Sequence, residues 1–220
     1  MSESPDALLE RLFAAERDVR GLHDRLAAAG RERVMGSIRK TLSSADKLEQ
    51  EEASLRLVCV ARLLGEFEGA DVADALVDVL ACDLPEVRSE AGEQLEGLAF
   101  ERFREVAEAA ERALLRLPAD SPALVELPYL LVEIPEGGVL KLLGKFLAHG
   151  SGDVVASAIE ALVEIGDLGG VKMLLPLQAD ERTTVVGDDR GAPGEVTIGE
   201  LAIEALELLQ PLDDLASDED

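Results

Sequence analysis

One stripe of apolar and small residues recurs four times along the chain and constrains the fold more than any other feature. The last position of the stripe is filled by Leu64, Leu98, Ile165 and Leu209. Seven residues before this last position stand Leu57, Ala91, Ala158 and Ala202. Three residues before the same last position stand Ala61, Leu95, Leu162 and Leu206. Spacings of seven and three place each set on one face of a helix, where small residues let a second helix approach closely.

Each of these helices is followed by a break and a second amphipathic segment, so the repeated unit is a helical hairpin. The second segments span 70–82, 103–117, 139–150 and 171–177. The units start near 51, 85, 121 and 152, and a final helix is expected at about 198–210. One hairpin cannot bury its own apolar face, whereas stacked hairpins bury one another's. The pattern predicts an all-α solenoid, in which the phrase AIEAL at 158–162 and 202–206 belongs to the packing and not to a catalytic site.

The first helices of two units carry a family resemblance. Residues 84–99, LPEVRSEAGEQLEGLA, and 152–167, GDVVASAIEALVEIGD, resemble the first helix of a HEAT repeat, with its Pro, Val-Arg, Ala and late Leu, although Val155 replaces the Arg. The resemblance covers about 51–210 and is nearest to the short HEAT-like repeats of bacterial proteins, including the lyases that attach bilins to phycobiliproteins. It implies a right-handed α–α superhelix over 51–212. We expect an N-terminal helical cap over 1–50 and an acidic, disordered tail over 213–220.

Two segments depart from the repeat. Residues 121–135 carry Pro128 in mid-helix and apolar side chains nearly all round, so this helix is covered either by its neighbours in the stack, which we favour, or by another chain. Residues 183–198 place β-branched residues on both sides of a Gly, Asp and Pro cluster, which is typical of a β-hairpin or a long loop. This segment is either a plain connector or a functional projection from a rigid scaffold.

The N-terminal segment follows a different pattern. Ser4-Pro5 makes a helix start. A heptad stripe follows, formed by Leu8, Leu12, Ala15, Val19, Leu22 and Leu26. We expect this stripe to cap the solenoid; its other use is self-association, for which the apolar residues 121–134 offer a second route.

Composition excludes several classes of protein. The net charge is −25, and residues 51–220 hold 12 Lys or Arg against 37 Asp or Glu, so nucleic acid is not an expected partner. No apolar stretch reaches the length of a membrane span and no signal-like segment begins the chain, so we expect a cytoplasmic protein with no membrane partner. Cys59 and Cys82 lie inside apolar helical patterns and are expected to be reduced core thiols.

The chain lacks the residues of common catalytic sites. His23 and His149 are its only histidines, no His-Glu pair occurs, and no phosphate-loop, nucleophile-elbow or dinucleotide motif is present. Asp188, Asp189 and Glu195 do not have the spacing of an EF-hand loop. We therefore expect no enzyme activity, no metal and no cofactor. Two alternatives stay open: a lyase-like protein that handles a tetrapyrrole or another small molecule, and a structural subunit of a fixed assembly.

The second helices supply the candidate binding site, because in HEAT stacks these helices line the concave side. Their outward polar positions are Asp71, Asp74, Asp78, Glu105, Glu108, Glu111, Lys141, Lys145 and Lys172. The carboxylates come first along the chain and the lysines follow, so this surface is expected to orient a partner of the opposite polarity. The sequence thus predicts a non-enzymatic adaptor or scaffold that binds another protein, one with a basic segment, through the concave face.

Overall fold

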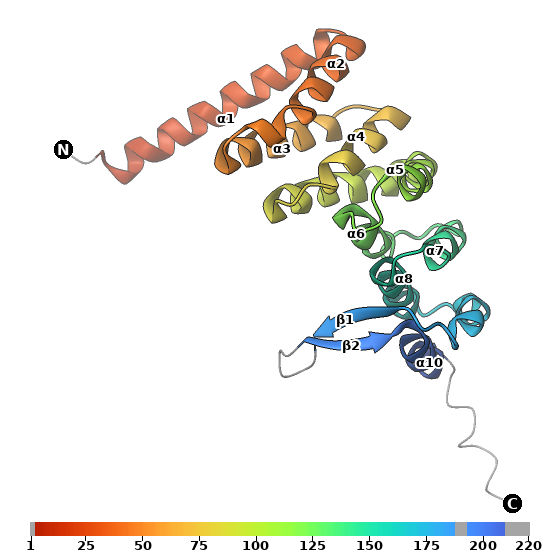
Figure 1. Cartoon of the computed structure of the whole chain (residues 1–220). Helices are drawn as coiled ribbons and strands as arrows, with labels where there is room; N and C mark the ends of the chain where they lie inside the picture. The colour runs from red at the N-terminus through yellow and green to blue at the C-terminus, as the bar shows by residue number, and fades with distance from the viewer. Residues whose placement is uncertain (1–2, 188–192, 210–220) are drawn as a thin grey trace, which may run out of the picture.

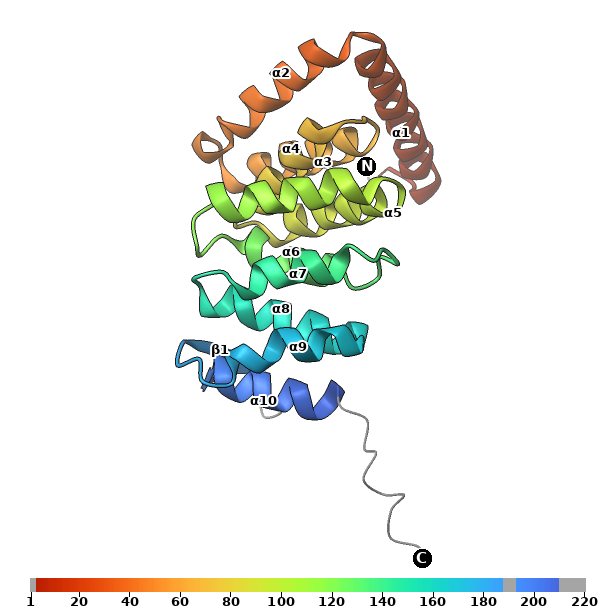
Figure 2. The same ribbon diagram turned by 90° about the vertical axis from the view of Figure 1, so that its right-hand side faces the viewer.

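The chain folds into a stack of paired helices. A computed structural model describes residues 3–187 and 193–209. Each pair has a first and a second helix, and Figure 2 shows the second helices in front of the first ones. The pairs are α3 (Gln50–Gly65) with α4 (Ala70–Leu80), the two halves of α5 (Pro85–Arg116), α6 (Pro122–Leu130) with α7 (Val139–Leu147), and α8 (Gly152–Ile165) with α9 (Val171–Leu174). The prediction of an all-α solenoid is confirmed.

The recurrent stripe forms the seam between first helices. Its members in α3, in the first half of α5, in α8 and in α10 (Ile198–Leu209) are at most 7% exposed, apart from the half-buried Ile165. Ala91, Ala158 and Ala202 are fully buried. The core is built from Leu, Ala and Val with few aromatic side chains. Small side chains at these positions allow the helices to stack at short axial distances.

The segment α5 consists of two helices that are separated by a kink at Arg102. Arg102 has φ −145° and ψ 51°, which is not helical, and it directly precedes the second segment expected at residues 103–117. The second half of α5 therefore folds back as the partner of the first half. Short 3₁₀ turns flank the other units: η1 (Ala45–Lys47) precedes α3, and η2 (Leu168–Gly170) and η3 (Leu175–Leu177) extend α9 at both ends.

The apolar helix α6 is covered mainly by the stack itself. Ala123, Leu124, Leu127 and Pro128 are buried, and so are Leu131 and Ile134 just beyond the helix. The helix lies between α5 and α8, and Tyr129 is its one residue above 36% exposure. The expectation that neighbours cover this segment is confirmed.

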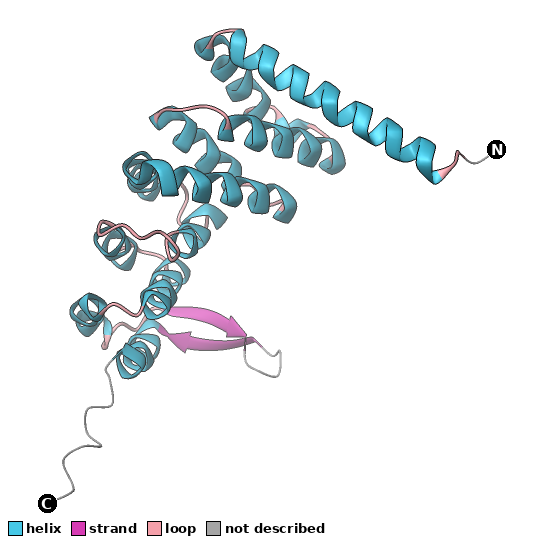
Figure 3. Cartoon of the chain, turned by 180° about the vertical axis from the view of Figure 1, so that it is seen from behind, coloured by secondary structure: helices cyan, strands magenta, loops and turns pink. Residues whose placement is uncertain are grey.

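The N-terminal end of the stack is closed by α2 (Arg31–Leu42), not by α1 (Pro5–Ala28). The helix α2 buries Val34, Met35 and Ile38, whereas α1 buries no residue. Figures 1 and 3 show α1 running away from the stack on the side of the first helices. Within the expected cap of residues 1–50, the helix that covers α3 and α4 is therefore α2, whereas the heptad stripe of residues 8–26 faces solvent and does not contribute as expected.

A two-stranded antiparallel hairpin projects from the C-terminal end of the stack on the same side as α1 (Figure 3). Strand β1 (Thr183–Gly187) pairs with β2 (Pro193–Thr197) in a register that sets Thr183 opposite Thr197 and Gly187 opposite Pro193. The expected hairpin is confirmed. Residues 188–192, and the expected tail at 213–220, lie outside the described residues.

The two cysteines differ from expectation. Cys82 is half-buried at the end of α4, and burial raises the pKa of its thiol. Cys59 is exposed, because the stripe of Leu57, Ala61 and Leu64 turns the opposite face of α3 outward. The core location predicted for Cys59 is therefore wrong. Across residues 3–187 and 193–209, no helix combines the length and the apolar character that a membrane crossing needs.

Candidate functional site

Four of the six acidic positions predicted on the second helices form ion pairs with a neighbouring helix. The Arg112 Nε donates to the Asp74 Oδ1 at 3.0 Å, and Arg116 pairs with Asp78, so two bridges join α4 to the second half of α5. At the N-terminal end Arg31 pairs with Asp71, and the Arg39 Nη2 lies 3.5 Å from the Asp71 Oδ2. These carboxylates therefore face counter-charges supplied by the chain itself.

A further pair between units joins Glu111 to Lys145 of α7. Glu108 instead accepts from Arg104 at 2.8 Å within the second half of α5. We call the series of pairs between helices, from Asp71 to Lys145, the ion-pair ladder. The pairs of Asp74, Asp78 and Glu111 are partly solvent-exposed and contribute on the order of 0–1 kcal/mol each, so the ladder aligns neighbouring units more than it stabilises them.

The remaining predicted positions are placed less uniformly. Glu105 is half-buried, and its Oε2 is among the buried polar atoms without a hydrogen-bond partner in the described structure. Lys141 and Lys172 are exposed and form no ion pair with any described residue. Glu108, Glu111 and Lys141 line a shallow pocket of about 380 Å³ between the second half of α5 and α7. The structure thus brings three of the nine predicted residues to one pocket and leaves Lys172 apart from them, on α9.

A second candidate site lies on the opposite side, where the hairpin stands beside the first helices. A pocket of about 340 Å³ separates α8 from α10, and one of about 380 Å³ separates α6 and α8 from β1. The two pockets are adjacent, because both are lined by Glu160 and Val186, and together we call them the C-terminal groove. Its further lining side chains are Val125, Tyr129, Asp153, Ala156, Ser157, Ile159, Val163, Glu164, Thr184, Val185, Leu201, Glu204, Ala205 and Leu208.

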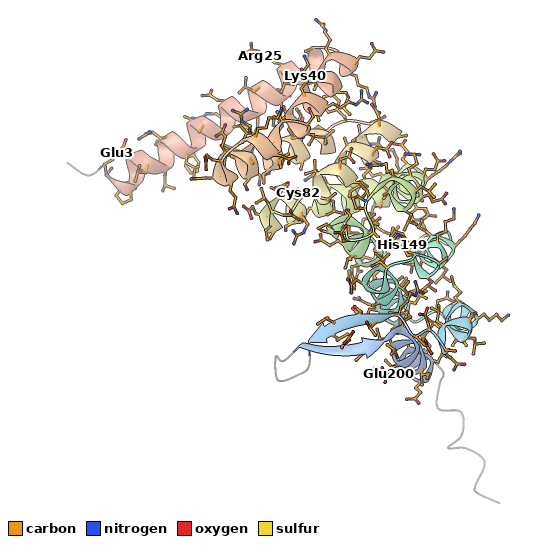
Figure 4. The ribbon with its side chains drawn as sticks, viewed as in Figure 1. Glu3, Arg25, Lys40, Cys82, His149 and Glu200 are labelled. Atoms are coloured by element: carbon orange, nitrogen blue, oxygen red, sulfur yellow. The ribbon has the colours of Figure 1, made fainter. Side chains whose placement is uncertain are left out.

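The hairpin is held as a wall of this groove by contacts at its base. The Thr184 Oγ1 donates to the Asp153 Oδ1 at 2.6 Å, which ties β1 to the first turn of α8. The guanidinium of Arg182 donates to the backbone oxygen of His149, a residue that Figure 4 places at the turn before α8. The Arg182 Nε also donates to the Asp180 Oδ1 at 2.9 Å, and this hydrogen bond lowers the pKa of the Asp180 carboxyl. The base of the hairpin is therefore fixed by charged hydrogen bonds.

The C-terminal groove is acidic without compensation from its own elements. The carboxylates that line it are Asp153, Glu160, Glu164 and Glu204, and the described residues of α6, α8, β1 and α10 include no Lys or Arg. The first helices do have a ladder of their own further up, in which the Arg62 Nε donates to Glu90 at 2.7 Å and the Arg88 Nε to Glu126 at 2.5 Å. That ladder ends at α6. From there on, the described part of the stack presents carboxylates to the groove with no cation opposite.

Tyr129 joins the two parts of this surface. Its hydroxyl donates to the Glu160 Oε2 at 2.5 Å, from α6 to α8. Burial raises the pKa of the Tyr129 hydroxyl, and the hydrogen bond to Glu160 and the charges of Glu160 and Glu164 raise it further. The hydroxyl therefore remains a neutral hydrogen-bond donor to Glu160 at any physiological pH.

Sequence reasoning missed the C-terminal groove, although a signal was present. Glu160 and Glu204 are the Glu residues of the two AIEAL phrases, so the phrase that supplies the buried stripe also supplies the groove carboxylates. The ion pairs between units had a signal as well. Asp74 with Arg112, Asp78 with Arg116, and Glu126 with Arg88 are each separated by 38 residues, close to one repeat length.

Neither histidine contributes to a cluster of metal-ligating groups. The His23 Nδ1 lies 2.5 Å from the Glu66 Oε1, and the His149 Nδ1 accepts from the backbone of Ser151 at 3.2 Å. Glu195 accepts from the Thr183 Oγ1 at 2.8 Å, while Asp188 and Asp189 lie outside the described residues. Within the described ranges, no three or more His, Cys, Asp and Glu side chains gather in a way that could hold a metal ion.

The fold and the groove define a class of protein: a helical repeat solenoid with an exposed apolar and acidic groove at one end. No family model and no curated protein matches the sequence. Two engineered proteins solved by the Northeast Structural Genomics Consortium are similar at 20% identity, over 87% of this chain and 88% of that one with a TM-score of 0.31, and at 18% identity, over 96% and 95% with a TM-score of 0.36. A designed armadillo repeat protein in complex with the peptide (KR)4 is similar at 19% identity, over 94% and 96% with a TM-score of 0.35.

Proposed function

We propose that this chain is a non-enzymatic, HEAT-like scaffold that binds a segment of another protein in the C-terminal groove. The observation that carries the proposal is the charge of that groove. Glu160, Glu164 and Glu204 surround apolar side chains on elements whose described residues contain no Lys or Arg. A partner segment with apolar residues beside Lys or Arg would fill the groove and supply the cations that the chain's own ladders supply elsewhere.

The chemistry of the occupant follows from the lining. Ile159, Val163 and Leu201 are buried or half-buried in the walls, whereas Leu208 is 66% exposed at the rim. Burying such apolar surface against a partner supplies affinity, and the surrounding carboxylates select partners of opposite charge and accelerate the encounter. The expected partner therefore carries a basic, amphipathic segment.

The other predictions made from the sequence stand as follows beside this proposal. The HEAT-like character is supported by Pro85 at the start of α5, by the fully buried Val87 and Ala91, and by Arg88, which bridges to the next unit. The predicted site along the second helices is a less favoured location, because its carboxylates are already engaged in the ion-pair ladder. The cytoplasmic location, the tetrapyrrole alternative and the exclusion of nucleic acid stay predictions from the sequence.

The experiment is selection of random peptides against the full chain, followed by affinity measurement on synthetic copies of the selected peptides. We expect the peptides to combine Leu, Ile or Phe with Lys or Arg. Replacing Glu160, Glu164 and Glu204 by Gln is expected to weaken binding about tenfold or more, since each lost charge pair at a partly desolvated site contributes measurably. Leu208→Ser tests the apolar rim and should also weaken binding.

A matched control separates groove recognition from attraction to a protein of net charge −25. Glu32, Glu93 and Glu133 are exposed and form no ion pair with any described residue, so replacing them by Gln changes the net charge equally. Peptide affinity should be unchanged in this control. Equal weakening in the two triple variants would mean that binding is unspecific charge attraction, and the proposal would be rejected.

A further inference from the structure

The helix α1 presents an apolar stripe that nothing in the described chain covers. Its six stripe residues, from Leu8 to Leu26, are all exposed, and the five large ones are between 38% and 60% exposed. The helix has 24 residues, a length of about 36 Å. Amphipathic helices of this length gain most of their stability from covering the apolar face, so an uncovered stripe marks an interaction surface.

The base of α1 fixes its direction away from the stack. Gly30, between α1 and α2, has φ +94°, a backbone conformation that favours glycine and turns the chain sharply. His23 contacts Glu66 at the start of the loop after α3, and α2 is anchored by its buried side chains. Glu3 and Arg25, near the two ends of α1, mark its course away from the solenoid in Figure 4. The stripe is therefore offered to a partner outside this chain.

The stripe follows a heptad, and the residues beside it carry charge in a specific order. With Leu12, Val19 and Leu26 at position a and Leu8, Ala15 and Leu22 at position d, position g holds Arg11, Asp18 and Arg25. Position e holds Leu9, Glu16 and His23. In a two-stranded coiled coil these flanking positions decide the orientation of the helices.

The charges match in a parallel pair of identical helices and clash in an antiparallel one. In a parallel pair each g residue faces the e residue five positions later on the other helix, which sets Arg11 opposite Glu16. His23, the residue opposite Asp18, already contacts Glu66 of its own chain, so the charge match rests on Arg11 and Glu16. In the antiparallel pair that aligns the same core, Arg11 faces Arg25, Glu16 faces Glu16, and Asp18 faces Asp18. Like charges in facing positions disfavour that arrangement.

We propose that α1 forms a parallel two-stranded coiled coil with α1 of a second copy of this chain. The dimer presents two solenoids, and with them two C-terminal grooves, so a partner with two binding segments would gain affinity by simultaneous engagement. The dimer does not depend on what the grooves bind. An anionic membrane surface is a poorer partner for this helix, because α1 contains five acidic and four basic residues and the whole chain has a net charge of −25.

The first test is the mass of the full chain across a concentration series, measured by sedimentation equilibrium. The wild type is expected to reach twice the 23.4 kDa of one chain. Leu12→Glu with Val19→Glu should keep the mass of one chain. At concentrations where the wild type is also monomeric, its thermal unfolding should match the wild type, because neither side chain is buried in the single chain. Leu55→Glu with Leu115→Glu is the matched control, since these leucines are 60% and 90% exposed on the stack, and it should still dimerise.

The second test is orientation. Arg11→Glu would set Glu opposite Glu16 in the parallel pair and is expected to weaken the dimer about three- to tenfold, whereas adding Glu16→Arg should restore it. In an antiparallel pair Arg11→Glu would instead remove a repulsion and strengthen the dimer. In a Cys59→Ser background, Leu12→Cys should form an interchain disulfide under mild oxidation, because a positions meet each other only in the parallel arrangement.

Each remaining outcome overturns the proposal. A wild type that stays at the mass of one chain at every concentration, including one that associates only with a different protein, has no α1 homodimer. A higher assembly contradicts the two-stranded form. Strengthening by Arg11→Glu, or failure of the thiols at position 12 to cross-link in a dimer, contradicts the parallel orientation.

Discussion

Gly152 determines how closely the hairpin approaches the stack. It is the first residue of α8, and a Cβ added there would lie 2.3 Å from the backbone oxygen of Thr183 in β1. The obstacle is backbone and not the end of a flexible side chain, so it cannot move aside without displacing the strand. Asp153, the next residue, holds Thr184 by a hydrogen bond. One glycine thus permits the contact that makes β1 a wall of the C-terminal groove.

Gly152→Ala is predicted to destabilise the protein by about 1–3 kcal/mol, as overpacking of a close contact does. The same change at Gly97 is the control: that residue lies inside α5, a Cβ there meets nothing within 4 Å, and Ala should stabilise the helix by up to about 1 kcal/mol. Urea unfolding of both variants measures the two effects. Equal stability of the two would show that β1 does not pack against α8 as described.

At the scale of elements, α10 begins with a reciprocal pair of hydrogen bonds. The Glu200 backbone N–H donates to the Thr197 Oγ1 at 3.1 Å, and the Thr197 backbone N–H donates to the Glu200 Oε2 at 2.8 Å. This capping box ends β2 and starts the helix at adjacent residues. The hydrogen bonds from Thr197 lower the pKa of the Glu200 carboxyl. The junction therefore couples the hairpin to the last helix of the described stack.

Thr197→Ala is predicted to lower the free energy of unfolding by about 1 kcal/mol, the usual effect of removing a Thr cap. The pH dependence gives a sharper test. Because the pKa of Glu200 is lowered in the folded state, its contribution is present above the ordinary carboxyl pKa and is lost as the pH falls through the lowered value. Wild type and Glu200→Gln should therefore differ in stability at pH 7 and converge in acid, as urea unfolding at both pH values will measure.

The control for this pH prediction is Glu207→Gln on the same helix. Glu207 is exposed and accepts no hydrogen bond within the described structure, so its replacement should leave no pH-dependent difference from the wild type. A constant difference between wild type and Glu200→Gln at every pH would contradict the role of the charged carboxylate in the cap.

At the scale of the whole molecule, the architecture was predictable because each unit contacts only its neighbours. The spacing of seven and three that aligns Ala91, Leu95 and Leu98 is imposed by one local contact, the seam between first helices, and so it is visible in the sequence. The break at Arg102 and the hairpin at 183–198 were visible for the same reason, since turn residues act locally.

The features that could not be predicted depend on contacts between units. Asp71, Asp74 and Asp78 looked like a binding surface because their counter-charges lie elsewhere in the sequence, on α2 and on the second half of α5. The heptad stripe of α1 has the same pattern whether it caps a solenoid or faces another chain, and periodicity does not distinguish the two. The C-terminal groove depends on where the hairpin folds back, which no local pattern specifies.

The stack also predicts how damage spreads along the molecule. In a one-dimensional array a central unit is coupled on two sides and a terminal unit on one, so a defect in the centre should lower the stability of both flanks while a defect at the end should remain local. Leu95 in α5 is 1% exposed and Leu206 in α10 is 4% exposed. Leu95→Ala and Leu206→Ala are therefore a matched pair of cavity-forming changes, each expected to destabilise the protein by about 2–5 kcal/mol.

Hydrogen exchange followed by mass spectrometry should show faster exchange from α3 through α8 in the Leu95→Ala variant. In the Leu206→Ala variant, faster exchange should be confined to α9, the hairpin and α10. Uniform acceleration in both variants would mean that the chain unfolds as one cooperative unit and that nearest-neighbour coupling does not govern it.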